Sequence, residues 1–114
     1  MNLMIGQRRN GAVTVLYLSG RIVLGEESTH LLETLKELAA GGERKILLNL
    51  GEVTYLDSAG LGALVRSRTA VAEQNGQFKL LHVPAKIQTL LRITKLQHLF
   101  EMFDDEATAV ASFS

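Results

Sequence analysis

The chain of 114 residues has no cysteine, and this absence excludes several kinds of scaffold and site. Without thiols there is no disulfide framework, no zinc ribbon and no cysteine nucleophile. The absence also agrees with a reducing compartment, so we expect the protein to be cytoplasmic. Proline occurs once, and no linker, repeat or low-complexity segment interrupts the chain. We therefore expect one domain over residues 1–114, a length that allows a self-sufficient core.

The chain also has no excess of positive or negative charge and no long apolar run. Twelve basic and twelve acidic side chains cancel, which argues against nucleic acid as a partner, because phosphate binding needs a basic excess or a basic face. The longest apolar runs, such as Ile46–Leu48, are far shorter than the roughly 20 residues that span a bilayer. The first six residues are too short and too mixed for a secretory signal. We expect no direct membrane insertion.

Strand and helix patterns alternate along the chain. Strand patterns, dense in β-branched and aliphatic residues, occupy Leu3–Arg9, Ala12–Ser19, Lys45–Leu50, Gln77–Val83 and Leu99–Phe103. Helical patterns, with apolar residues three or four positions apart, occupy Ser28–Ala40, Ser58–Gln74, Pro84–Thr94 and Asp104–Ser112. The turn pair Asn10-Gly11 joins the first two strands as a hairpin. These patterns predict an α/β fold, a single-domain mixed β-sheet of four to five strands with alternating helices packed against it.

Several element boundaries and one strand position are also predicted. The almost uninterrupted aliphatic run Lys45–Leu50 is typical of a strand buried on both faces, so we place it in the middle of the sheet. Glu27 or Ser28 is expected to cap the first helix, and Pro84 to occupy the first position of the third helix. Asp105 and Glu106 are expected in the first turn of the last helix, where acidic residues favour the helix dipole.

The segment from Asp57 to Gly62 is the most informative for function. It places a polar pair at the junction of a strand-exit loop and a helix, and Gly60 and Gly62 in that helix's first turn. Each glycine disfavours a helix by about 1 kcal/mol relative to alanine, so two in one turn suggest a need for bare, approachable backbone. A purely structural role also fits, with Ser58 as an exposed N-cap and the glycines allowing the helix to pack tightly on the sheet.

Three chemical roles for this segment can be compared. A nucleophilic serine needs a glycine-serine-glycine elbow and a base, but here Asp57 precedes Ser58 and the only histidines are His30, His82 and His98. A phosphate-binding loop needs a lysine, which Gly60–Val65 lacks. The third role is that of a phosphoacceptor, because an exposed hydroxyl with small neighbours lets a kinase approach. The histidines have no recognisable metal spacing, and we expect no metal or cofactor.

The run Asp57-Ser58-Ala59-Gly60-Leu61-Gly62 resembles the aspartate-serine-any-glycine-leucine-glycine signature of STAS domains of the bacterial anti-sigma factor antagonist type. The resemblance covers nearly the whole chain, with supporting matches at Gly20, in the aliphatic third strand and in Leu90–Leu96. It implies a small cytoplasmic, non-enzymatic protein that binds an anti-sigma factor serine kinase and thereby releases a sigma factor.

The resemblance also implies roles for individual residues. Ser58 would accept phosphate from kinase-bound ATP, and a serine phosphatase would be a further partner. Asp57 would shape the loop and the kinase contact. The implied partner-binding residues are Asp57, Ser58, Ala59, Gly60, Leu61 and Gly62. We expect a small exposed apolar patch around Ser58, since a partner surface needs one.

Two positions depart from the family pattern. Many members have an aspartate in the stretch where this chain has Val23, and the third strand often ends in Asp-Leu where this chain has Asn49-Leu50. Two alternatives therefore stay open beside the phosphorylation switch. The nearer is a STAS scaffold subunit of a stress-signalling or lipid-transport assembly without phosphorylation, and the distant one is a small serine hydrolase that uses Ser58.

Overall fold

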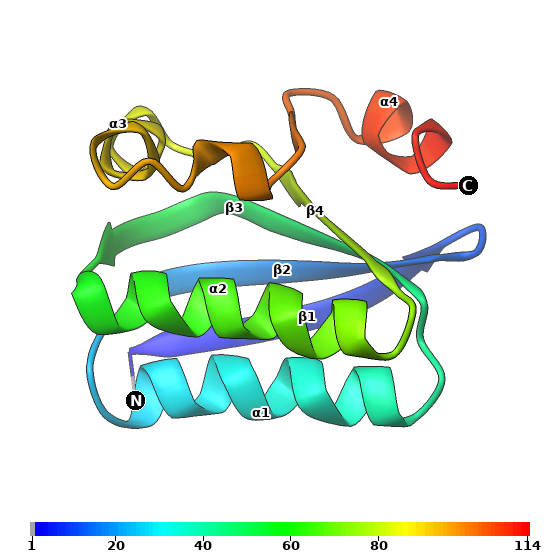
Figure 1. Ribbon diagram of the computed structural model, residues 1–114, viewed down its shortest axis with the longest axis horizontal. Coiled ribbons are helices and arrows are strands. Elements are labelled where there is room, and N and C mark those ends of the chain that lie inside the picture. Colours follow the sequence, from blue (N-terminus) through cyan, green and yellow to red (C-terminus); the bar gives the residue numbers. More distant parts are fainter. Residues whose placement is uncertain (1) are drawn as a thin grey trace.

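A mixed sheet in the order β1-β2-β3-β4-β5 forms the centre of the computed structural model, which describes residues 2–114 (Figure 1). The strands are β1 Leu3–Asn10, β2 Val13–Ile22, β3 Lys45–Leu56, β4 Gln77–Leu81 and β5 Met102–Phe103. β1 and β2 form the antiparallel hairpin, and every other neighbouring pair is parallel. The predicted fold class, hairpin and central position of the third strand are confirmed.

Helices cover the two faces of this sheet unequally. They are α1 Glu26–Ala40, α2 Ser58–Glu73, α3 Ala85–Ile93 and α4 Glu106–Ala111, with a 3-10 turn, η1, at Gln97–Leu99. Figure 1 shows α1 and α2 side by side on one face and the short α4 on the other. None of the helices among residues 2–114 is long and apolar enough to cross a membrane.

Strand alternation divides the apolar residues into two cores. The larger core lies under α1 and α2 and includes Leu16, Leu18, Ile46, Leu48 and Leu64, all at most 1% exposed. The smaller core lies under α4 and consists of Val13, Val15, Leu47, Leu81 and Ala109, with Tyr17, Phe103, Val110 and Phe113 packed against it. Because successive side chains of a strand point to opposite faces, the continuous aliphatic run of β3 supplies both cores.

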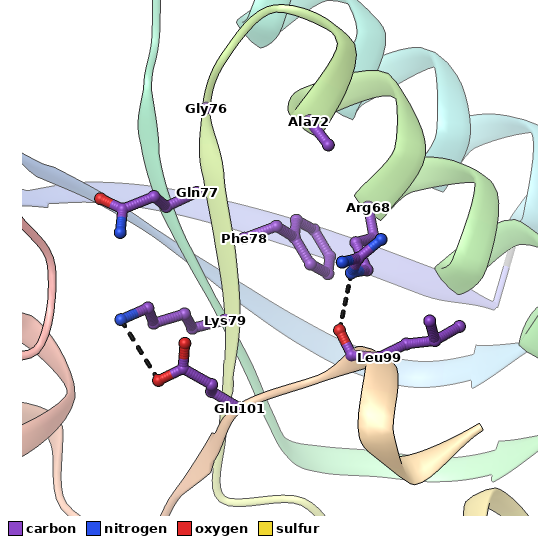
Figure 2. Close-up of a pocket in the computed structure, with 8 residues that line it drawn as sticks. All are labelled: Arg68, Ala72, Gly76, Gln77, Phe78, Lys79, Leu99 and Glu101. Carbon is purple, nitrogen blue, oxygen red and sulfur yellow. Dashed lines mark hydrogen bonds and ion pairs between the residues drawn. The ribbon is translucent and has the colours of Figure 1, made fainter. Parts of the chain in front are cut away.

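Polar anchors attach the C-terminal segment to the rest of the molecule. Lys79 is 4% exposed, and its Nζ donates hydrogen bonds to the carbonyl oxygen of Ser112 at 2.9 Å and to its Oγ at 3.0 Å. The same Nζ lies 3.4 Å from a carboxylate oxygen of Glu101, and Arg68 Nε donates to the carbonyl oxygen of Leu99 at 2.6 Å (Figure 2). These bonds hold η1 and the chain end against β4 and α2.

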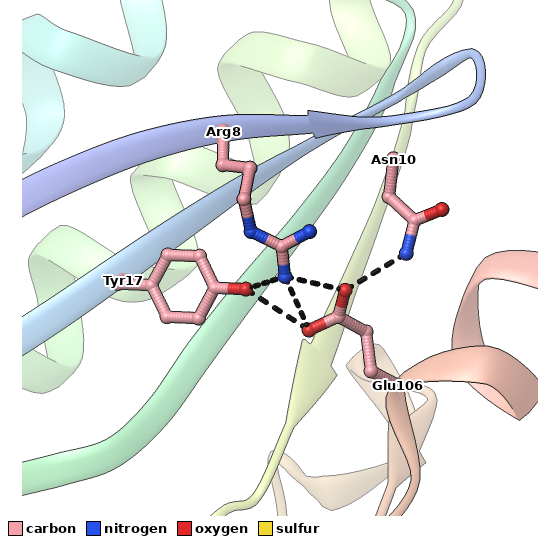
Figure 3. Close-up of polar contacts among 4 residues, drawn as sticks. All are labelled: Arg8, Asn10, Tyr17 and Glu106. Carbon is pink, nitrogen blue, oxygen red and sulfur yellow. Dashed lines mark hydrogen bonds and ion pairs between the residues drawn. The ribbon is translucent and has the colours of Figure 1, made fainter.

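A second anchor joins α4 to the hairpin (Figure 3). The Glu106 carboxylate accepts hydrogen bonds from Arg8 at 2.7 and 3.0 Å, from Asn10 at 2.8 Å and from Tyr17 at 3.0 Å. Arg8 also contacts the Tyr17 hydroxyl. Three side chains of β1 and β2 therefore hold Glu106 in place. Two of them, those of Arg8 and Asn10, lie more than ninety residues before Glu106 in the chain.

Several predicted boundaries are wrong. Helix α1 begins at Glu26, so Glu27 and Ser28 both lie within the helix and neither caps it. The N-cap is Gly25, whose φ of 104° favours glycine, and no side chain caps this end. Pro84 is the N-cap of α3, since its ψ of 148° is not helical. Strand β4 ends at Leu81 because His82 has a φ of 54°.

Other elements differ in length from the prediction. Strand β3 continues past Leu50 to Leu56, because β2 also continues past Gly20 and pairs Ile22 with Leu56. Strand β5 is limited to Met102–Phe103, since Gln97–Leu99 forms η1. Asp105 is the N-cap of α4 and lies before its first turn, because its side chain accepts the Thr108 N–H.

Candidate functional site

The predicted site lies at the junction between β3 and α2. Leu56 ends the strand, Asp57 is a one-residue junction, and Ser58 is the first residue of the helix. The Asp57 N–H donates to the carbonyl oxygen of Ile22 at 3.3 Å, so the junction is attached to the end of the neighbouring strand β2. Two strand ends and one helix start therefore converge here.

The Asp57 carboxylate organises this junction. Its Oδ1 accepts the Gly60 N–H at 2.8 Å and its Oδ2 accepts the Leu24 N–H at 3.0 Å. These backbone hydrogen bonds, from Leu24 first and then from Gly60, hold the pKa of Asp57 below its ordinary value. The bonds favour the charged form, so the carboxylate ties α2 to the loop that follows β2.

Asp57, and not Ser58 as predicted, is therefore the N-cap of α2. Its backbone is extended, with φ −96° and ψ −176°, while Ser58 already has helical hydrogen bonding. A cap residue needs such a non-helical backbone to aim its side chain at the free N–H groups of the first turn. The helix itself is confirmed, since it runs from Ser58 to Glu73.

Ser58 is exposed, as predicted, and its hydroxyl makes no hydrogen bond within residues 2–114. Because Asp57 supplies the cap, the hydroxyl has no structural bond to lose when it is modified. It stands at the N-terminal end of a sixteen-residue helix, whose dipole favours negative charge.

The two glycines of the first turn have different roles. A Cβ on Gly60 would lie 2.1 Å from the carbonyl oxygen of Ile22 and 2.9 Å from Leu56 Cδ1, so only glycine lets α2 approach β2 this closely. A Cβ on Gly62 would meet only the mobile end of Arg66, at 3.0 Å. Gly60 is therefore a packing requirement, whereas the fold does not require Gly62.

The signature residues divide into supporting and accessible ones. Gly60 is buried and Leu61 is 7% exposed, so both support the loop from inside. Ser58 is exposed, and Ala59 and Gly62 are half-buried. Leu64 is fully buried in the larger core.

An exposed apolar patch does adjoin Ser58. Leu24 is 77% exposed and Tyr55 is 54% exposed, and the Arg21 guanidinium lies 5.6 Å from the centre of the Tyr55 ring. The expected patch around Ser58 was predicted without its residues, and Tyr55, Leu24 and Arg21 were not identified from the sequence. No sequence signal marks them, since a single leucine in a loop reads the same whether it is buried or exposed.

The two departures from the family pattern lie in different places. Val23 belongs to the loop beside Asp57, and its carbonyl oxygen accepts the Ser28 N–H at 3.1 Å, so it acts through its backbone. The Asn49 side chain accepts the Gly51 N–H at 2.9 Å. Asn49 precedes the end of β3 by seven residues, or roughly 20 Å of strand. Asn49 therefore does not belong to the Ser58 surface.

The three histidines lie on other elements. His30 is in α1, His82 follows β4 and His98 is in η1, and Ser58 Oγ has no hydrogen bond to any of them. Within residues 2–114, no group of three histidine, aspartate or glutamate side chains could hold a metal ion. A nucleophilic serine needs a base within hydrogen-bond reach, and none of the three histidines forms a hydrogen bond with Ser58.

Comparison with known proteins agrees with this geometry. The STAS domain family model matches residues 5–109. The anti-sigma-B factor antagonist of Staphylococcus aureus strain NCTC 8325 is 35% identical over 80 residues, which cover 70% of this chain and 72% of that protein. In fold, the chain is similar to an anti-sigma factor antagonist from Mycobacterium paratuberculosis, with a TM-score of 0.83, 18% identity and coverage of 97% and 93% of the two chains.

A second similar structure is the Bacillus cell fate determinant SpoIIAA in its phosphorylated form, with a TM-score of 0.74, 15% identity and coverage of 95% and 97% of the two chains. The solved structures are similar in fold, and the family match and the Staphylococcus relative extend the similarity to the sequence. On this combined evidence of sequence and fold, the chain belongs to the STAS domain family.

Proposed function

We propose that this protein is an anti-sigma factor antagonist that phosphorylation of Ser58 switches. The unmodified protein binds an anti-sigma factor serine kinase in the cytoplasm, and a sigma factor is thereby released. The observation that carries the proposal is the exposed Ser58 hydroxyl on a backbone held by Asp57 and Gly60. The names of the relatives support it, as does the phosphorylated form of the similar Bacillus protein.

The chemistry of the switch needs little from this chain. Ser58 Oγ attacks the γ-phosphorus of ATP bound to the kinase, the bond from that phosphorus to ADP breaks, and the hydroxyl proton passes to a base of the kinase. Asp57 is a weak base for that proton, because the backbone hydrogen bonds from Leu24 and Gly60 hold its pKa below the ordinary value. This chain contributes an accessible and rigidly placed hydroxyl.

Phosphorylation changes binding more than it changes folding. It adds about 1.5 to 2 negative charges beside Asp57, and the positive end of α2 offsets part of the repulsion. At an interface, a newly unpaired charge costs several kcal/mol, and each 1.4 kcal/mol is about tenfold in affinity. The phosphorylated domain therefore stays folded and leaves its partner, and a serine phosphatase would reverse the change.

Two variants of Ser58 test the proposal. We expect Ser58→Ala to fold with stability within about 0.5 kcal/mol of wild type, because Asp57 provides the cap. It should bind the kinase but take up no phosphate. Ser58→Asp should fold and bind more weakly, though the loss should be smaller than for phosphoserine, because a carboxylate carries less charge. Ser19→Ala, at another exposed serine, is the matched control.

The measurements are mass spectrometry after incubation with the anti-sigma factor kinases of the source organism and ATP, and calorimetric titration of the same kinases. Phosphate on Ser58→Ala would show that another serine is the acceptor. Equal affinity of wild type and Ser58→Asp would contradict control by charge. Binding without any phosphorylation would favour the scaffold alternative.

A further inference from the structure

A groove adjoins the Ser58 loop, next to the end of β3. One wall is the end of β3, with Tyr55 and Leu56, and the other is the start of α3, with Pro84, Lys86, Ile87 and Leu90. Its volume is about 310 Å³. That is the lower end of the roughly 300–1,000 Å³ typical of small-molecule pockets, and it is enough room for one large side chain.

The lining of the groove is apolar except at its mouth. Aliphatic and aromatic side chains and one proline form most of the walls, and no acidic residue lines it. Lys86 is exposed and is the only charged lining residue.

Lys86 is not neutralised within residues 2–114. The ion pairs there are Arg8–Glu106, Arg9–Glu43 and Lys79–Glu101, and none of them includes Lys86. An apolar depression beside such a cation is complementary to an apolar side chain with a carboxylate next to it.

We propose that this groove receives an apolar side chain of the anti-sigma factor, flanked by a carboxylate that meets Lys86. The inference rests on the proposed function, because it extends the Ser58 surface. Leu56 lines the groove and Asp57 directly follows it, so one partner surface covers both without a gap. Exposed Tyr55 is the aromatic anchor at their border.

This arrangement also makes the effect of phosphate more specific. Ser58 follows Tyr55 by three residues, so a phosphate there adds negative charge next to the place where the partner's carboxylate docks. The repulsion acts on the contact that Lys86 would otherwise stabilise. Phosphate would therefore disfavour the bound state through the partner's own acid as well as through Asp57.

Two substitutions on α3 test the groove without touching the phosphoacceptor loop. Lys86→Glu reverses the charge at the mouth, and a glutamate in the first turn of a helix is compatible with folding. Lys36→Glu, exposed on α1, is its matched control. Ala85→Trp fills the groove from its rim, and Ala107→Trp, exposed in the first turn of α4, is the control for added bulk.

The probe is the purified anti-sigma factor kinase with ADP, which permits binding without phosphate transfer, titrated by calorimetry at low and high salt. We expect Lys86→Glu and Ala85→Trp each to bind about tenfold more weakly than wild type at low salt, while both controls stay within about twofold. High salt should shrink the deficit of Lys86→Glu, since ions screen an exposed charge, but not that of Ala85→Trp.

Wild-type affinity for Lys86→Glu and Ala85→Trp, with weaker binding of Ser58→Asp, would overturn the groove and leave the proposed function standing. Failure of wild type to bind the kinase would overturn both. Light scattering that shows a dimer of this chain, lost in Ala85→Trp, would assign the groove to a second copy and overturn the inference. Flotation of wild type, but not Lys86→Glu, with phosphatidylglycerol vesicles would assign it to lipid and would also overturn it.

Discussion

The two faces of the sheet are covered by different means. The face under α1 and α2 is held by apolar packing, with most of its core side chains fully buried. The face under α4 has a smaller apolar cluster and depends on the Glu106 and Lys79 anchors for its attachment. The first face should therefore respond to changes of side-chain volume, and the second to charge, salt and pH.

The larger face is expected to show the largest single effect. Leu48 is fully buried under α1 and α2. We expect Leu48→Ala to destabilise the protein by roughly 2–5 kcal/mol, because the substitution leaves a cavity in close-packed surroundings. Urea unfolding measures the change. Met4→Ala, on a side chain that is 72% exposed, is the control and should alter stability by less than about 0.5 kcal/mol. An unchanged midpoint for Leu48→Ala would show that β3 is not central.

A smaller effect should come from the close approach of α2 to β2. Gly60→Ala should destabilise by about 1–3 kcal/mol, because the new Cβ would overlap the Ile22 carbonyl oxygen. Gly62→Ala, two residues later, should be neutral or stabilising by up to about 1 kcal/mol, since alanine favours a helix and only the Arg66 side chain must move. Thermal unfolding of the pair gives the comparison, and equal effects would contradict the assigned difference.

Asp57 is a polar residue that stabilises the larger face. We expect Asp57→Ala to destabilise the protein less than Gly60→Ala does. Its folded-state pKa is lowered by backbone hydrogen bonds, so its contribution to stability is present above the unfolded-state pKa of about 4 and is lost as pH falls through the folded value. Asp57→Ala should lower the urea midpoint at pH 7 and have less effect at pH 2–3. If Asp57→Ala lowered the urea midpoint by the same amount at every pH, this role of the carboxylate would be contradicted.

The smallest change is expected at the α4 anchor. Hydrogen bonds, first from Asn10, hold the pKa of Glu106 below its ordinary value, so its contribution is present at neutral pH and is lost in acid. Glu106→Gln should cost at most about 1 kcal/mol at neutral pH, because solvent screens this partly exposed cluster, and the loss should shrink at high salt. Hydrogen exchange of the α4 amides should rise in the variant. Faster exchange in α1 as well would show that the two faces are not independent.

Local sequence patterns determined much of this protein. Alternation of β-branched runs with helical periodicity predicted the order of the elements, and the aliphatic run Lys45–Leu50 predicted the central strand, because each depends on residues close together in the chain. The turn pair Asn10-Gly11 predicted the hairpin for the same reason. The exposed start of α2 at Ser58 was predicted from the same local pattern.

Tertiary structure alone decided the details of the site. Aspartate and serine are both good N-caps, and Asp57 takes that role where its junction meets Ile22 and Leu24, more than thirty residues earlier in the chain. The same strand end makes Gly60 a packing requirement and leaves Gly62 unconstrained. Glu106 meets Arg8 and Asn10 only after the sheet has formed. The N-cap role of Asp57, the requirement for Gly60 and the Glu106 anchor all depend on contacts between segments that are distant in sequence. Local sequence patterns do not predict such contacts.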